Sequence, residues 1–431
     1  MKRSFVTMNP MVWMLFCMMS IAAGCGGSAG VEAEPVVIGA GTPNAVSAWN
    51  EAATTTVNQP NAAAGTPEEM QSVYAVDLAS VHVAMYDAAV AIAGGHQPFY
   101  VTPRARADGA SPEAAIAAAA YGVLRGLFPS RAAFYQPVYD AQLAALPDGD
   151  AKQQGLALGA EVAAGVLAAR ANDGRMTPLA PFVAGTGPGQ FRGPALVGRS
   201  YPFIRPFALD AAAQFRPAGA PALVSAQYAA DYAETRALGG SASTSRSAEQ
   251  ATAARFHSEP PSAFWPRNLR RFVMTERPLA EQARLGALLW VTHADATIAC
   301  FEAKYHFLAW RPFSAINLGD TDGNDATAAD AAWTPLLPTP PHPEYPAAHA
   351  CVAAAVAQAL RLHFGTARVS YDFDSKASAS TQHYADVEAL LTDVTTARIA
   401  GGMHFRSALV DGAVLGRGVA AWTSNRRFQS R

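Results

Sequence analysis

Lysine is scarce in this 431-residue sequence, and charged residues of all kinds make up only 15% of it. Of the 32 basic residues, only those at positions 2, 152, 304 and 376 are lysines. The formal net charge is −2, and no basic cluster alternates with aromatic residues. Because a nucleic-acid-binding face needs a basic surface, nucleic acid is excluded as a partner. A lysine inside an apolar segment of such a chain is therefore a candidate functional residue.

Signals for β-strands are also scarce. Runs of β-branched residues are rare, no segment repeats at a fixed period, and 50% of the residues are hydrophobic. Glycine and proline fall mostly between segments with helical periodicity. The sequence therefore predicts an all-α fold, with two helical halves in one large domain and a loop-rich segment at 176–222 between them. Helices are expected at 43–57, 67–94, 111–127, 131–147, 150–173, 224–238, 246–256, 278–311, 347–364, 383–399 and 405–422.

The N-terminal residues form a separate unit. A short basic start precedes an apolar stretch, 11–23, that is too short to span a bilayer comfortably. Small residues then lead directly to Cys25, as in a bacterial lipoprotein signal. We expect a signal peptide at 1–24, lipidation of Cys25 and a flexible tether at 25–42. The exported protein would be anchored by its lipid, facing the periplasm or the cell exterior. An ordinary secretory signal with an incidental Cys25 is the alternative.

Cysteine is rare, with four residues in the whole chain. Cys17 lies within the signal and Cys25 directly follows it, which leaves Cys300 and Cys351 for the folded protein. Export permits a disulfide between these two. Two buried thiols that pack as small apolar groups are equally compatible with the sequence. Neither cysteine belongs to the paired spacing that is typical of a zinc site.

The segment EAKYHFLAWRP, residues 302–312, contains the isolated lysine. Lys304 and Arg311 are seven residues apart, which places both on one helical face near the end of the helix. Pro312 then discourages further helix. In isolation, a lysine that extends toward solvent and pairs with Glu302 explains the segment as well.

The segment HPEYPAAHAC, residues 342–351, places a histidine at the start of a helix. Pro346 suits the first turn, where the amides that follow, including that of Ala348, are donors without helical partners. They lie at the positive end of the helix dipole and can bind an anion. His349 could exchange a proton with such an anion. A histidine that caps its own helix is the alternative.

The segment ARIAGGMHFRSALVDG, residues 397–412, supplies further candidates. Arg398 ends one helical pattern, and a glycine pair breaks it. His404 then opens the next pattern, with Asp411 two turns along the same face. Arg398 paired with Asp393, together with a His404 buried in the core, is the alternative.

Together these segments place one lysine, two arginines, two histidines and a helix N-terminus within residues 290–412. This set suits a tetrahedral or trigonal-bipyramidal oxyanion. Three cations neutralise its oxygens, one histidine bonds the central atom, and the other histidine handles protons.

The order and spacing of these residues resemble the three-part signature of the vanadium-dependent haloperoxidases, which belong to the phosphatidic acid phosphatase type 2 superfamily. The three parts are Lys304-x6-Arg311-Pro, Pro-Ala-Ala-His349 and Arg398-x5-His404. Further likeness to the exported bacterial branch lies in 81–92, 111–129 and 295–316. The resemblance covers residues 43–425.

This resemblance implies an α-helical bundle over 43–425, with vanadate as the cofactor and no haem. His404 would bond vanadium and His349 would act as the acid–base group. The equatorial oxygens would be held by Lys304, Arg311, Arg398 and the Ala348 amide. The implied activity is oxidation of halide by hydrogen peroxide to a hypohalous species, with halide or a small organic molecule as substrate. An acid phosphatase that hydrolyses phosphate monoesters through a phosphohistidine is the alternative, and a homodimer is compatible with both.

Two positions depart from the family pattern, and a third bears on the halide. The family usually has Ser-Gly before the acid–base histidine, whereas Ala347-Ala348 lacks the hydroxyl, which predicts weaker anion binding. The superfamily often has Asp four residues after the last histidine. That position is Ala408, and Asp411 would replace the Asp only if geometry allows. Chloride-oxidising members tend to have Phe at the position of His342 and bromide-oxidising members His, which favours bromide or iodide.

Overall fold

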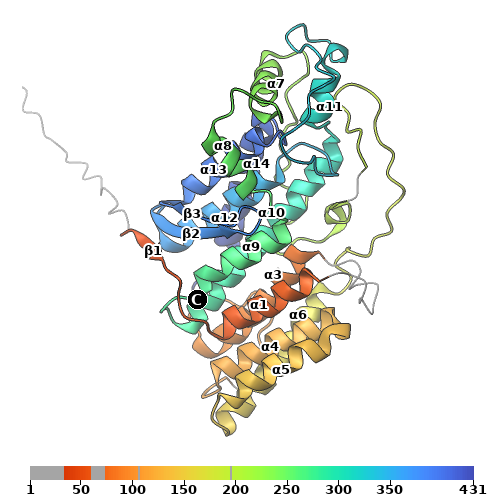
Figure 1. Ribbon diagram of the computed structural model, residues 1–431. Helices are drawn as coiled ribbons and strands as arrows, with labels where there is room; N and C mark the ends of the chain where they lie inside the picture. The colour runs from red at the N-terminus through yellow and green to blue at the C-terminus, as the bar shows by residue number, and fades with distance from the viewer. Residues whose placement is uncertain (1–33, 60–72, 105–106, 195–196) are drawn as a thin grey trace, which may run out of the picture. The chain divides into compact units, whose positions relative to one another are not determined.

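The computed structural model describes residues 34–59, 73–104, 107–194 and 197–431. The expected signal peptide, Cys25 and part of the expected tether lie outside the described residues. The described residues fall in one compact unit. Helices dominate it, which confirms the predicted fold class (Figure 1). They are α1 (Ala45–Val57), α3 (Tyr74–Ala93), α4 (Pro112–Leu127), α5 (Ala132–Ala144), α6 (Asp150–Arg170), α7 (Ala226–Gly239), α8 (Ala248–Phe256), α9 (Pro261–Leu269), α10 (Leu279–Phe307), α11 (Pro312–Asn317), α12 (Ala348–Phe364), α13 (Val387–Ala400) and α14 (Arg406–Arg426).

The N-terminal half is a bundle of α1 and α3–α6, in which α4 packs against both α3 and α6. Alanine and glycine allow this close approach. A Cβ atom added at Gly159 of α6 would lie 2.3 Å from the carbonyl oxygen of Ala115 in α4. The abundant alanine of the sequence therefore shortens the distance between helices and keeps the interior densely packed.

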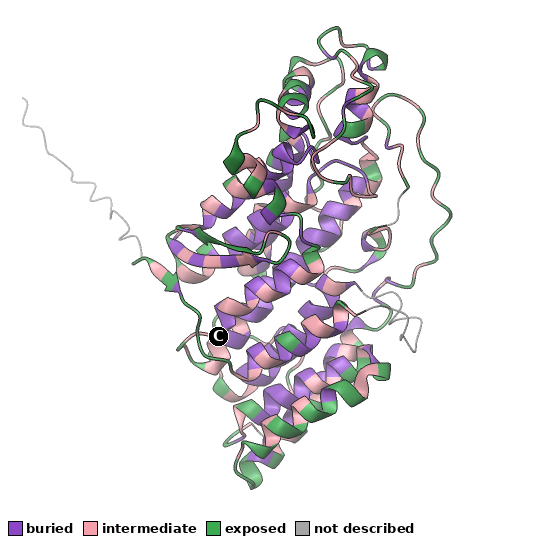
Figure 2. Cartoon of the chain, viewed as in Figure 1, coloured by how far each residue is buried: buried purple, intermediate pink, exposed green. Residues whose placement is uncertain are grey.

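The C-terminal half is built around α12, which packs against α10, α13 and α14 and is buried along most of its length (Figure 2). Gly416 of α14 faces the backbone of α12, where an added Cβ atom would lie 2.0 Å from the carbonyl oxygen of Cys351. Cys351 forms a disulfide with Cys300 of α10. Of the two states that the sequence allowed, the structure therefore has the cross-linked one.

The sequence did not predict the short helices α9 and α11 or a small sheet. β1 (Val36–Ile38) pairs in parallel with β2 (Val369–Ser375), which pairs antiparallel with β3 (Ser380–Tyr384). In β2 alternate side chains are buried, as expected for a strand with one face on the core. The helix expected from residue 383 begins only at Val387, where Asp386 accepts hydrogen bonds from the first-turn amides.

The end of α10 corrects another prediction. The helix stops at Phe307, because Leu308 adopts a left-handed conformation (φ 52°) and donates its N–H to the carbonyl of Lys304 at 2.9 Å. Arg311 lies beyond the helix, in extended backbone before α11. The expectation that Lys304 and Arg311 share a helical face is therefore wrong, and the chain reversal brings Arg311 back instead.

Two buried aspartates dock irregular segments onto the core helices. Asp295 of α10 and Asp87 of α3 each accept hydrogen bonds from three successive backbone amides, which would otherwise be buried without partners. The donors are Phe207, Ala208 and Leu209 for Asp295, and Phe99, Tyr100 and Val101 for Asp87. The loop-rich segment between the two halves is thus tied to α10, the helix that carries Lys304.

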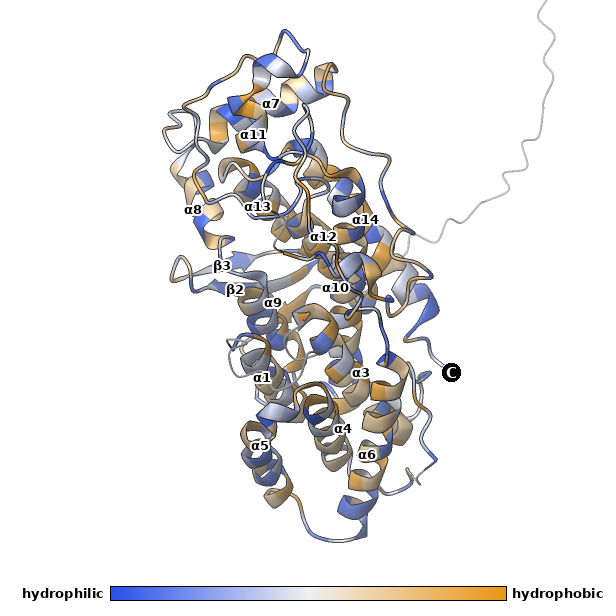
Figure 3. Cartoon of the chain, turned by 90° about the vertical axis from the view of Figure 1, so that its right-hand side faces the viewer, coloured by the Kyte–Doolittle hydropathy of each residue, from blue (hydrophilic) through white to orange (hydrophobic). Residues whose placement is uncertain are grey.

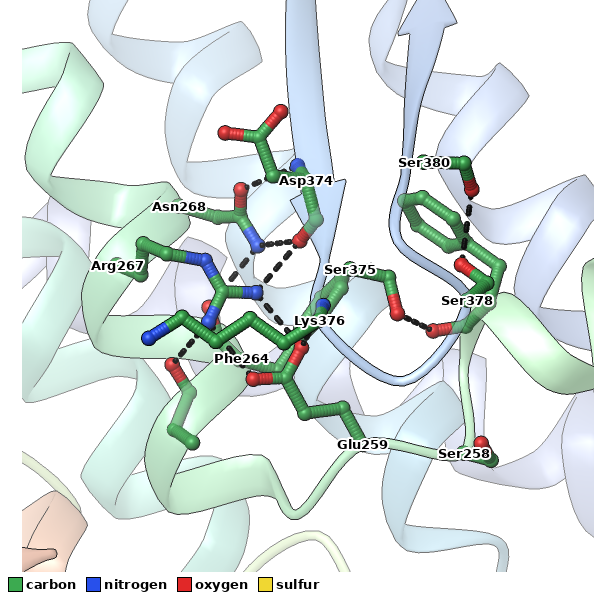
Figure 4. A network of polar contacts seen from close by, with 12 residues as sticks. Ser258, Glu259, Phe264, Arg267, Asn268, Asp374, Ser375, Lys376, Ser378 and Ser380 are labelled. Carbon is green, nitrogen blue, oxygen red and sulfur yellow. Dashed lines mark hydrogen bonds and ion pairs between the residues drawn. The ribbon is translucent and has the colours of Figure 1, made fainter.

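A polar network fixes the segment after α8 to α9 and to the β2–β3 hairpin (Figure 4). Arg267 donates to both carboxylate oxygens of Glu259 at 2.7 Å and to the carbonyl of Asp374 at 2.7 Å. The amide of Lys376 donates to Glu259 at 2.9 Å. Charge-assisted, bidentate contacts of this kind hold a loop in one position.

Within the described part of the chain, α3 is the one helix that is long and apolar enough to cross a membrane by length and composition. Most of its residues are buried against the neighbouring helices, and Figure 3 colours the chain by hydropathy. Such burial is typical of a central helix in a folded core.

Candidate functional site

Three basic side chains lie deep in the C-terminal half. Lys304 of α10 is 0% exposed, Arg311 before α11 is 2% exposed, and Arg398 of α13 is 4% exposed. The ammonium group of Lys304 donates to the carbonyls of residues 343 and 344 at 2.9 and 2.8 Å. Arg311 donates to the carbonyl of His342 at 2.8 Å. The segment 342–344, which precedes α12, therefore lies directly against two of the three cations.

Among the described residues, no carboxylate forms an ion pair with any of these three cations. Glu302 accepts a hydrogen bond from Arg216 at 2.9 Å and does not pair with Lys304. Asp393 contacts His257 and not Arg398. Burial is the first cause that holds the pKa of Lys304 well below its usual value and lowers the pKa of Arg398 to about 9. Buried charge without a counter-ion is costly, so this arrangement favours an anionic ligand.

Arg398 is the least satisfied of the three. One of its terminal nitrogens donates to the carbonyl of His257 at 3.2 Å, and its buried Nε–H has no hydrogen-bond partner among the described residues. Buried polar groups are nearly always paired in folded proteins. An unpaired guanidinium N–H beside two other cations therefore indicates a place for an oxyanion.

His404 is held in one tautomer by a carboxylate that the sequence analysis did not single out. Its Nδ1 lies 2.9 Å from Oε1 of Glu344, which also accepts the amide of Phe405 at 3.0 Å. Because the carboxylate accepts, Nδ1 carries the proton and Nε2 keeps its lone pair. Nε2 accepts from Arg311 at 3.2 Å. His404 therefore directs an unprotonated nitrogen toward the cations.

Among the residues that the structure describes, Glu344 is the one carboxylate in hydrogen-bonding contact with this histidine. Burial raises its pKa to about 7, while the charges of Lys304 and Arg311 act in the opposite direction. A single carboxylate carries at most one negative charge and cannot neutralise three cations, so the site stays net positive. Sequence reasoning could have found Glu344, because it is the only acidic residue in the quoted segment 342–351.

Asp411 does not take the orienting role that the sequence left open for it. His404 precedes α14, so the two residues do not lie two turns apart on one helix. The carboxylate of Asp411 accepts from the hydroxyl of Tyr345 at 2.6 Å instead. Glu344, which arrives from the segment before α12, contacts His404 in its place.

His349 lies in the first turn of α12 and is only partly buried. Burial is the main cause that lowers its pKa well below the usual value, and Arg398 is the nearby charge with the largest effect. Within the residues that the structure describes, no hydrogen bond to its ring is found. The N-cap residue Ala347 offers no side-chain acceptor, which leaves the first-turn amides, including that of Ala348, for a ligand.

His342 completes the group. One of its ring nitrogens accepts from Arg311 at 3.0 Å, and its ring centroid lies 5.2 Å from that of Phe301. Like Ala348 and His349, it is partly exposed, whereas the three cations are buried. The site therefore has a cationic floor, and its accessible side is formed by residues of the segment 342–349.

One cavity in the described part of the chain lies away from the site and another lies beside it. One, of about 590 Å³, is lined by Tyr232, Arg236 and Trp333 among others, and none of the three buried cations borders it. A smaller cavity of about 50 Å³ borders Glu344 and Asp231. The described residues contain no group of three His, Cys, Asp or Glu side chains that could hold a metal cation. The donor set fits an oxyanion instead.

Comparisons with known proteins identify the fold. Residues 284–430 match the family model described as the VCPO second helical-bundle domain. A bacterial vanadium-dependent iodoperoxidase structure aligns with a TM-score of 0.68 and 21% identity, covering 90% of this chain and 95% of that one. A bacterial vanadium-dependent chloroperoxidase in its holo form aligns with a TM-score of 0.67 and 15% identity, covering 90% and 98%. No curated protein matches the sequence. The family resemblance stated from the sequence is thus supported.

Proposed function

We propose that this chain, which shares the fold of the bacterial vanadium haloperoxidases, is a vanadate-dependent haloperoxidase that oxidises halide with hydrogen peroxide. One observation carries the proposal. Lys304, Arg311 and Arg398 are buried together beside two histidines, with Glu344 as the carboxylate in contact. A buried excess of positive charge of this size is stabilised by a multiply charged oxyanion.

Vanadate fits the donor set of this chain. The unpaired Nε–H of Arg398 and the first-turn amides of α12 supply donors for its oxygens, and Nε2 of His404 supplies a lone pair for the central atom. When bound there, vanadate would supply Lewis-acid activation of hydrogen peroxide. Lys304 and Arg311 would hold its oxygens by charge. The missing hydroxyl at Ala347 predicts weaker anion binding than a serine would give.

His349 has the properties of the acid–base group. Its lowered pKa keeps the imidazole neutral at neutral pH, so that it can accept a proton from hydrogen peroxide. Its partial exposure leaves it accessible to substrate, whereas His404 is 1% exposed. The two histidines therefore divide the work, His404 as anchor and His349 as proton carrier.

Bromide or iodide is the halide we propose. His342 occupies the position that tends to be histidine in bromide-oxidising proteins of this type, and it contacts Arg311 directly. The iodoperoxidase structure also aligns at higher identity than the chloroperoxidase structures do.

A phosphatase is the second candidate, and the Glu344–His404 pair favours it. A carboxylate that fixes the tautomer of a histidine leaves Nε2 as a nucleophile toward phosphorus. His349 would donate a proton to the leaving group once the negative charge of bound phosphate has raised its pKa. Phosphate and vanadate share shape and charge, so the same cations would hold either anion.

Parallel assays separate the two functions. Purified protein is reconstituted with vanadate and tested for bromide and iodide oxidation by hydrogen peroxide, and the vanadate-free protein is tested with p-nitrophenyl phosphate. Lys304→Ala should abolish whichever activity is found. Lys152→Ala is the matched control, since Lys152 is also largely buried but pairs with Asp148 in the other half. Halide oxidation that is absent in the wild type, or that survives Lys304→Ala, would contradict the haloperoxidase proposal.

Export as a lipoprotein is a separate proposal, supported by the apolar stretch that ends in small residues before Cys25. The lipid would hold the enzyme on the membrane facing the periplasm or exterior. Intact-mass measurement of membrane-purified protein should show a chain that begins at a lipidated Cys25. An unmodified Cys25 in the mature protein would refute it.

A further inference from the structure

His257 is a buried histidine, 4% exposed, at the C-terminal end of α8. Its Nε2 lies 2.9 Å from Oδ2 of Asp393, and the hydroxyl of Tyr384 donates to the same oxygen at 2.7 Å. The ring is therefore held in one orientation by a carboxylate that is itself held by a second group. None of the sequence motifs contains this histidine.

The backbone of His257 supports the cationic site. Its carbonyl accepts from Arg398 at 3.2 Å, which is the only hydrogen bond of that guanidinium to the described part of the protein. Asp393 and Arg398 lie five residues apart on α13. One helix thus holds His257 twice, by its ring through Asp393 and by its carbonyl through Arg398.

The residues on either side of His257 are also anchored. The hydroxyl of Ser375 donates to the carbonyl of Phe256 at 2.7 Å. On the other side, Glu259 is fixed by Arg267 and by the amide of Lys376 (Figure 4). The peptide that carries the His257 carbonyl lies between these two anchored points, and His257 itself is held there by the contact of its ring with Asp393.

We propose that His257 is a positioning residue of the oxyanion site, which orients the guanidinium of Arg398 through its carbonyl and is itself oriented by Asp393 and Tyr384. This rests on the proposed function. A guanidinium with one hydrogen bond has no other group that fixes its direction, so the place of its donors depends on this carbonyl.

The test measures binding of vanadate and of inorganic phosphate by calorimetry, apart from turnover. His257→Ala keeps the carbonyl but removes the ring contact that orients it, so the Kd of both anions should rise by roughly tenfold, the low end of the range for one charge-assisted hydrogen bond. In His257→Gln the side-chain amide can still donate to Asp393, so the Kd should return to within about threefold of wild type. The substitution should change Kd and KM more than kcat, because it alters a contact that positions the anion and leaves the group that transfers protons unchanged.

A matched control is His383→Ala, which removes an exposed histidine that also pairs with an aspartate, Asp372, at 2.8 Å. It should leave the Kd unchanged. Tyr384→Phe keeps the fold of the anchor while loosening Asp393, and should raise the Kd by about twofold to fivefold. It tests the proposal if His257→Ala does not fold.

The outcomes are separable. If wild type binds neither anion, the proposed function falls and takes this inference with it. If wild type binds and His257→Ala or Tyr384→Phe binds equally well, only the positioning role is wrong. Equal losses in His257→Ala and His257→Gln would also overturn it, because the gain from restoring the contact with Asp393 would be absent. A crystal structure of His257→Ala should show the guanidinium of Arg398 displaced.

Discussion

Replacing Arg398 with methionine should make the anion-free protein more stable while removing its oxyanion binding. Burial lowers the pKa of Arg398 from 12.5 to about 9, which at about 1.4 kcal/mol per pKa unit corresponds to a cost of about 5 kcal/mol for holding the charge. Loss of the hydrogen bond to the His257 carbonyl should destabilise the folded protein by about 1–2 kcal/mol. Imperfect packing of the methionine side chain should destabilise it by about 1 kcal/mol more. A net gain of about 2–3 kcal/mol remains.

The sign of this effect follows from proton linkage. Between pH 9 and 12.5 the folded protein holds fewer protons on this guanidinium than the unfolded chain does, so stability rises with pH there. Below about pH 9 both states are protonated and the cost is present in full. Neutral pH is therefore a suitable condition for the comparison.

The assay is urea unfolding at pH 7, with and without phosphate or vanadate. Wild type should gain stability from either anion, and Arg398→Met should gain little. Arg311→Met is the contrasting variant, because Arg311 donates to the carbonyls of His342 and Met403 and to both neighbouring histidines. Its removal leaves buried acceptors unpaired and should destabilise the protein by about 2–5 kcal/mol. An Arg398→Met protein that is less stable than wild type, or that is still stabilised by anions, would refute the reasoning.

Three further predictions concern the histidines and the disulfide. His404→Ala should abolish tight vanadate binding as well as turnover. His349→Ala should lower turnover and keep much of the vanadate affinity, because three cations and the helix amides remain. Equal losses of affinity in a vanadate titration of the two variants would contradict these roles. Because the pKa of His349 is lowered, its neutral form persists below pH 6.5, and protonation of this group should not lower kcat/KM between pH 7.5 and 6. A decline in kcat/KM near pH 6.5 that is absent in His349→Ala would contradict this prediction. Cys300→Ser with Cys351→Ser should lower the free energy of unfolding by about 2–4 kcal/mol, read from urea midpoints, because the disulfide closes a long loop with a sequence separation of 51.

The helices were predictable because their signals are local. Long alanine-rich segments with helical periodicity lie between glycine and proline residues, and most predicted boundaries fall within a few residues of those observed. The strand β2 was missed although Val369, Tyr371 and Phe373 alternate with polar residues, since a short strand shows itself only when its partner is known. The early end of α10 depends on a left-handed Leu308, which no local preference indicates.

The site shows the same division. The motifs contain the residues that the structure brings together, because Lys304, His349 and His404 each lie in a short segment whose residue types and spacing can be recognised in the sequence. The contacts that orient these residues could not be assigned from the spacing. Glu344 reaches His404 across 60 residues, and His257 reaches Arg398 across 141. Such contacts are created by packing of α8, α13 and α14 around the site, so sequence spacing alone could not assign them.

Under the proposed function the protein would handle strong oxidants, and the cross-link between α10 and α12 then has a chemical consequence. Cys300 lies one helical turn before Lys304, and Cys351 lies two residues after His349. As free thiols, both sulfurs would be buried and would meet peroxide only when the core opens, but oxidation to sulfenic or sulfinic acid would then enlarge side chains in the packed core beside the site. Joined to each other, they offer no thiol to attack. A chain folded under reducing conditions would therefore start active and lose activity with each round of peroxide it consumes, whereas the cross-linked chain would keep its activity.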